Sequence, residues 1–217
     1  MSPNPALVTL PVSLYNLGLA LGTIPAAIVT RHFGRRTGYL FGAGIGIISG
    51  LVATLGVIAA AFVIFCLGTF LAGFYGAYVQ SYRFAATDAA SDSFKARAIS
   101  LVMIGGLIAA VIGPQPVIWT RDALPAALFA GSFLSQAALA LLALPVLAML
   151  RTPKIAQART STGDGGPLRE ILLTPRFALA VAAGMVSYGS MSFVMTAAPI
   201  AMVGCGFTVG GDTLLPL

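Results

Sequence analysis

Apolar residues fill six long stretches of this chain, and short polar or basic segments separate them. A helix needs about 20 apolar residues to cross the hydrocarbon core of a bilayer, and each stretch reaches that length. The pattern therefore predicts an all-α, polytopic membrane protein with about six transmembrane helices. We expect the spans at roughly 7–30, 38–59, 61–82, 99–119, 126–150 and 178–202. A turn near Ile58–Ala61 must divide the second span from the third, because a single helix through both would overshoot a bilayer.

The positive charges lie in alternate loops between the predicted spans. The loops after the first, third and fifth spans are basic, whereas the turn near residue 60 has no charge and Arg121 stands beside Asp122. Cytoplasmic loops carry an excess of Lys and Arg, so we expect the loops at 31–37, 83–98 and 151–177 in the cytoplasm and 119–125 outside. The cations are Arg31, Arg35 and Arg36, then Arg83, Lys95 and Arg97, then Arg151, Lys154, Arg159, Arg169 and Arg176.

Composition excludes several classes of function. Hydrophobic residues make up 58% of the chain and charged residues 8%, against about 25% charged residues in soluble domains. The net charge of +6 comes from short loops and forms no continuous basic face, so we expect a lipid bilayer as partner and no nucleic acid. Cys66 and Cys205 fit no metal spacing, and we expect no metal and no cofactor. His32 is the only His, and no Asp or Glu lies within a predicted span, so the chain lacks the groups of an enzyme.

Glycines recur at every fourth position along the second predicted span. Residues four apart lie on one face of a helix. Small residues on such a face let the backbone of another helix approach closely within a membrane. We therefore interpret this series as a helix-packing face. Its members are Gly38, Gly42, Gly46 and Gly50.

Polar and small residues share one face of the third predicted span, opposite Tyr75, Tyr78 and Tyr82. They could line a substrate path, because polar side chains within a membrane seldom face lipid. The alternative, which we favour, is that the glycines pack against another helix and the polar groups bond neighbouring backbone. Asn16 in the first span and Tyr188 in the last are further candidates for the path. The candidates on the third span are Thr69, Gly73, Gly76 and Gln80.

The basic turn Gly34-Arg35-Arg36 and the step Gly113-Pro114 late in the fourth span resemble the major facilitator superfamily of transporters. The alternating loop charge and the long basic loop at 151–177 are similar to that family too. Three positions depart from the family's pattern: Ala27 and Arg31 stand where Gly and then Asp are usual upstream of the turn, and Thr69 stands where an intramembrane Arg is common. The run from Gln80 to Asp88 and the sequence Gly113-Pro114-Gln115 resemble a bacterial branch that includes a riboflavin transporter.

The resemblance implies an organisation into two bundles, of which this chain holds part. Residues 1–150 would form an amino-terminal bundle lacking its first helix, and 151–177 the cytoplasmic loop between bundles. Residues 178–217 would be the truncated first helix of a second bundle, so that the six spans match helices two to seven of the family. The charge pattern also puts Met1 outside with no signal peptide, which favours a fragment; the alternative is a complete chain with an external amino end.

The same resemblance implies transport of a small organic solute across the cell membrane by a multi-pass protein. A non-transporting membrane partner, or an inactive truncated transporter, is the alternative. The family's basic turn commonly pairs with an acidic residue at the end of a nearby helix. The resemblance therefore implies a cytoplasmic latch between the basic turn and the segment after the third span. Its candidate residues are Arg31, Gly34, Arg35, Arg36, Asp88 and Asp92.

Overall fold

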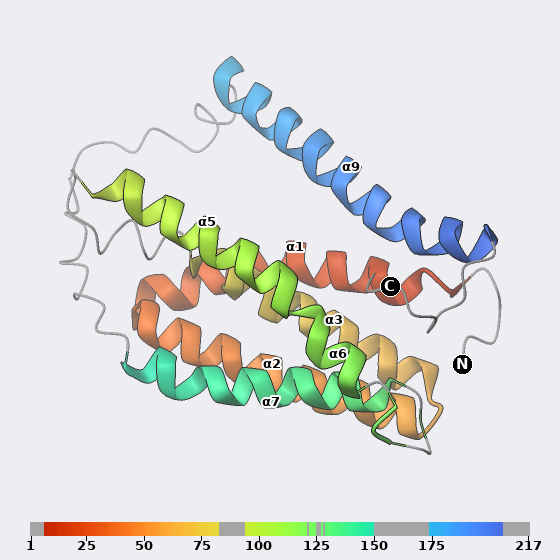
Figure 1. Ribbon diagram of the computed structural model, residues 1–217. Helices are drawn as coiled ribbons and strands as arrows, with labels where there is room; N and C mark the ends of the chain where they lie inside the picture. Colours follow the sequence, from red (N-terminus) through yellow and green to blue (C-terminus); the bar gives the residue numbers. More distant parts are fainter. Residues whose placement is uncertain are drawn as a thin grey trace. The chain divides into compact units, whose positions relative to one another are not determined.

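The computed structural model describes residues 7–82, 94–120, 122–124, 127, 129–149 and 174–205, and these are mostly helical (Figure 1). Within them, six helical segments are long and apolar enough to cross a membrane, which confirms the predicted all-α fold and its spans. Helices α5 and α6 together make one of these segments, Ala96–Thr120. The helices are α1 (Leu10–Phe33), α2 (Arg35–Ile58), α3 (Phe62–Gln80), α5 (Lys95–Ile112), α6 (Pro114–Thr120), α7 (Ala130–Met149) and α9 (Pro175–Gly204).

The chain divides into two compact units, Met1–Ala156 and Gln157–Leu217. The first unit contains α1 to α7, and the second contains α9. Most of the predicted inter-bundle loop at 151–177 lies outside the described residues, so the division at 1–150, 151–177 and 178–217 stays a prediction. Helix α9 begins at Pro175, three residues before the span expected at 178.

Two very short turns connect the first three helices. Gly34 alone separates α1 from α2, and its φ of 84° is a conformation that glycine adopts at little cost. The expected loop at 31–37 is therefore largely helical, because Arg is a good helix former and one glycine suffices to reverse the chain. The turn expected near Ile58–Ala61 is a Schellman motif: the Ala61 amide donates to the Gly56 carbonyl at 2.9 Å, and Ala60 to Val57 at 3.2 Å.

Helix α3 contacts both α1 and α2, and α2 also contacts α7; these four helices run side by side (Figure 1). Glycine lies at each of these contacts. Between α1 and α3, a Cβ added at Gly18 would collide with the Phe70 carbonyl, and one added at Gly73 would collide with the Tyr15 carbonyl. Between α2 and α3, a Cβ at Gly68 would lie 2.6 Å from the Ala53 nitrogen. The helices are therefore close enough for backbone to touch backbone.

The glycine series of α2 contacts three different helices, and all four members are buried. Gly38 lies against Thr30 of α1, while Gly42 and Gly46 lie against the rings of Tyr78 and Tyr75 of α3. The fourth member, Gly50, packs on α7, where an added Cβ would lie 2.8 Å from a backbone carbonyl oxygen, that of Phe133. One face of α2 thus contacts α1, α3 and α7, while α1 and α3 also pack directly on each other.

Helix α5 exposes large apolar side chains around its circumference, with Met103 70% and Leu107 69% exposed. Helices that are hydrophobic all round belong in a core or in a membrane. Lipid is the natural solvent for such a surface, and the described part of the chain thus has the character of a multi-pass membrane protein.

Replacing Gly46 by Leu is expected to reduce the amount of folded, membrane-inserted protein, because a Cβ there would already lie 3.0 Å from the Tyr75 ring. Gly44→Leu is the matched control, since a Cβ at Gly44 meets nothing within 4 Å. Fluorescence-detected size exclusion of the two variants in detergent measures the difference. Equal yields of folded protein would show that α2 and α3 do not meet at this glycine.

Candidate functional site

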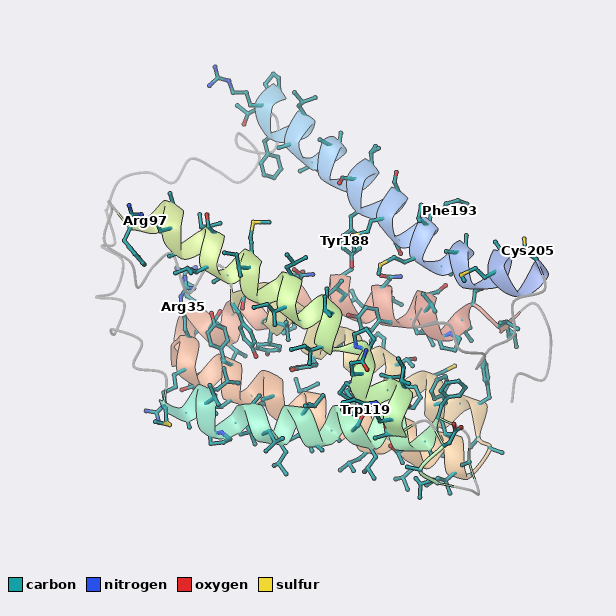
Figure 2. All side chains as sticks on the ribbon, viewed as in Figure 1. Arg35, Arg97, Trp119, Tyr188, Phe193 and Cys205 are labelled. Atoms are coloured by element: carbon teal, nitrogen blue, oxygen red, sulfur yellow. The ribbon has the colours of Figure 1, made fainter. Side chains whose placement is uncertain are left out.

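The basic turn lies at the junction of α1 and α2. Arg31 and His32 occupy the last turn of α1, where the negative end of the helix dipole favours a cation. Arg35 and Arg36 occupy the first turn of α2, which has no acidic residue and no side-chain cap; Figure 2 labels Arg35 at this end of the helix. Two cations at the positive end of a dipole reinforce the local positive potential, so this end of α2 attracts anionic groups.

The predicted latch would pair this turn with Asp88 or Asp92. Both aspartates lie outside the described residues, and the latch therefore stays a prediction. What the structure does place beside the turn is the carboxyl end of α3. The sequence predicted Tyr82 on the face of the third span opposite the candidate path, as an anchor at the membrane interface, and did not single out Tyr39.

Two tyrosines join the amino end of α2 to the carboxyl end of α3. The rings of Tyr39 and Tyr82 meet edge to face, with centroids 4.7 Å apart. The Tyr39 hydroxyl donates to the Ser81 carbonyl over a long 3.4 Å, and Tyr39 is only 2% exposed. Burial raises the pKa of the Tyr82 phenol, which follows the end of α3, and the phenols of Tyr75 and Tyr39 raise it further.

The small residues of the predicted substrate path on α3 are in contact with α1. Gly73 is buried against the backbone of Tyr15 and Leu19, and an added Cβ at Gly76 would lie 3.0 Å from the Tyr15 hydroxyl oxygen. These contacts support the interpretation in which the glycines pack. The sequence did not identify Tyr15, because spacing along a helix does not show whether a tyrosine faces lipid or covers a glycine of a neighbouring helix.

The polar members of the predicted path bond within their own helices or stay exposed. The Thr69 hydroxyl donates to the Cys66 carbonyl at 2.9 Å, and the Asn16 amide donates to the Val12 carbonyl at 3.1 Å. Such local bonds satisfy polar groups in an apolar medium. Gln80 ends α3 and is exposed. Tyr188 lies on α9 in the second unit and is 42% exposed. A role for these four residues along a substrate path stays a prediction.

A polar contact between α2 and α7 was missed by the sequence reasoning. Ser49 is fully buried and donates to the Gly46 carbonyl of its own helix at 2.8 Å. The Gln136 amide of α7 approaches the Ser49 hydroxyl oxygen at 3.5 Å, a long hydrogen bond across the two helices. An amide inside an apolar span was the signal available in the sequence. Among the residues that the structure describes, no three His, Cys, Asp or Glu side chains gather as metal ligands would.

Ser49→Ala is expected to destabilise the protein by about 0.5–1 kcal/mol, the usual range for a polar contact between membrane helices. Its matched control is Ser135→Ala, because the half-buried Ser135 hydroxyl donates only to Ser132 of its own helix at 2.8 Å in the described contacts. Thermal unfolding in detergent provides the comparison, and Ser49→Ala should lose its extra cost when Gln136 is already Leu. An undiminished cost in the Gln136→Leu background would rule out the bridge.

Comparison of the sequence with known proteins identifies its family. A model of the Major Facilitator Superfamily matches residues 2–216. The riboflavin transporter RfnT of Brucella anthropi is 66% identical over 96% of this chain and 53% of its own length. YdeG of Bacillus subtilis, an uncharacterized MFS-type transporter, is 36% identical over 75% of this chain and 40% of its own. No solved structure matches.

The chain spans about half the length of the curated relatives it matches. The family match nevertheless extends over nearly all of it, and the described helices agree with the family's transmembrane character. The resemblance suggested by the basic turn is therefore confirmed, and this chain belongs to the major facilitator superfamily.

Proposed function

We propose that these helices belong to a transporter that carries a small organic solute of the riboflavin class across the bacterial cell membrane. The observation that carries the proposal is the 66% identity to a relative named as a riboflavin transporter, which extends over 96% of this chain. The six apolar helical segments provide the scaffold that such a function needs. Transport moves a solute without breaking its covalent bonds and therefore needs no catalytic carboxylate. The predicted spans contain no Asp or Glu.

Secondary transporters of this general kind bind their solute near the bilayer midplane, between two bundles that rock against each other. In the proposed arrangement, residues 1–150 form most of one bundle, 151–177 the connection, and 178–217 the beginning of the other. The backbone contacts of α3 with α1 and α2 support a bundle that moves as a unit. Backbones packed directly on each other at glycine leave no room for the helices to shift against one another.

Riboflavin combines a flat aromatic ring system with a chain of hydroxyl groups. Aromatic side chains stack on such rings, and amides bond hydroxyl groups as donor and acceptor. Asn16, Gln80 and Tyr188 supply these groups, and Thr69 supplies a hydroxyl in the middle of α3. On this chemical ground the four residues are our candidates for the substrate path of the proposed transporter, beside the local bonds that Asn16 and Thr69 make within their own helices. A membrane partner that carries no solute is the competing function, and the uptake experiment separates the two.

Expression of this chain, together with any coding sequence that flanks it in the genome, is expected to restore growth of a riboflavin-requiring bacterium on low riboflavin. Uptake of radiolabelled riboflavin should accompany the growth, since the solute must enter before it is used. Gly44→Leu, which changes an open position, should leave uptake unchanged. Protein that is folded and inserted in the membrane but takes up no riboflavin would contradict this function and favour the non-transporting partner.

A further inference from the structure

The contact between the amino end of α2 and the carboxyl end of α3 differs in kind from the contact deeper along the same helices. Farther along, glycines of α2 receive the rings of Tyr78 and Tyr75 from α3. At the amino end of α2, the space beside Gly38 is filled by Thr30 of α1. What faces α3 there is the ring of Tyr39, which meets the ring of Tyr82.

We propose that Tyr39 and Tyr82 form an aromatic clamp that positions the basic turn of the transporter, by making the ends of α2 and α3 move together. Tyr39 follows Arg35 by four residues, and residues at this spacing are neighbours on one helix face. A ring fixed at Tyr39 therefore fixes the first turn of α2, which carries Arg35 and Arg36. This inference rests on the proposed transport function.

Three observations support the clamp. The two rings meet at an angle of 76° with centroids 4.7 Å apart, the edge-to-face arrangement in which aromatic rings attract each other. Tyr39 is almost wholly buried, so the protein groups around it restrict the motion of its ring. Its hydroxyl reaches the carbonyl of Ser81, one of the groups that the end of a helix leaves without an intrahelical partner.

The clamp completes a chain of fixed contacts around the turn. On one side, Gly34 joins α2 to α1 within a single residue, and Gly38 lies against Thr30. On the other side, Tyr39 joins α2 to the end of α3 through Tyr82. The arginines are thereby kept at a constant place relative to the carboxyl end of α3. Tyr39 and Tyr82 act as positioning residues in this proposal, because they orient the turn.

The first test measures a distance and needs no transport. Nitroxide labels at Thr37 and Val79, both exposed, report the separation of the two helix ends in the purified chain by pulsed electron resonance. Tyr39→Leu and Tyr82→Leu are each expected to broaden the distance distribution, and Tyr39→Phe to keep it narrow because the ring remains. Tyr82 is less buried than Tyr39, so its variant is informative even where Tyr39→Leu fails to fold. A distribution as narrow in folded Tyr82→Leu as in the unchanged chain overturns the clamp.

The second test measures riboflavin uptake per folded molecule. Tyr39→Leu and Tyr82→Leu are expected to lower the maximal rate several-fold while KM stays within about twofold, since a turn that is misplaced slows the cycle without removing solute contacts. Tyr39→Phe should restore the rate. Leu55→Ala, which shortens a 59% exposed side chain of the same helix, is the control. Equal rates in both Leu variants and the unchanged protein overturn the inference, whereas a lack of uptake by the unchanged protein refutes transport and leaves the distance test to decide the clamp.

Discussion

The structure depends on the close approach of helix backbones at glycine. In water, helices associate to remove apolar side chains from solvent, but lipid tails are as apolar as Leu and give no such gain. Association in a membrane must come from dispersion contacts and polar contacts, both of which require short distances. Gly18 and Gly73 provide such distances between α1 and α3, and Gly68 provides them between α3 and α2.

Helix α3 is central to this arrangement because it carries glycine toward both of its neighbours. Gly73 and Gly76 face α1, Gly68 faces α2, and its tyrosines fill the spaces left by the glycines of α2. The hydroxyl of Thr69 on the same helix bonds the backbone locally, so it adds no buried unsatisfied group. The basic turn is attached to this assembly at both sides, through Gly34 and through Tyr39.

Much of the fold could be predicted from the sequence because the bilayer imposes a fixed length on every apolar run. The same constraint explains why the turn near Ile58–Ala61 was foreseeable. The length of the basic turn was not: the sequence predicted a loop at 31–37, whereas Gly34 alone reverses the chain. Spacing identifies the faces of a helix but not the partner of each face. The four glycines of α2 were therefore recognised as one surface, while their division among α1, α3 and α7 required the structure.

The same limit applies to the candidate site. Asn16 and Thr69 stood out as polar groups within apolar spans, but their bonds to their own helices depend on rotamers that sequence does not specify. Tyr39 and Gln136 became significant only through residues distant in the chain, Tyr82 and Ser49. Asp88 and Asp92, which the family resemblance favours as partners of the basic turn, lie outside the described residues.

A double-mutant cycle between Gly46 and Tyr75 tests most directly whether glycine contacts hold these helices together. A methyl group at Gly46 would lie 3.0 Å from the Tyr75 ring, so the ring must shift to accept it. Thermal unfolding in detergent should show that Gly46→Ala destabilises the protein when Tyr75 is present and costs much less when Tyr75 is already Leu. The same cost in both backgrounds would contradict the account, because it would mean that α2 and α3 do not meet at this point.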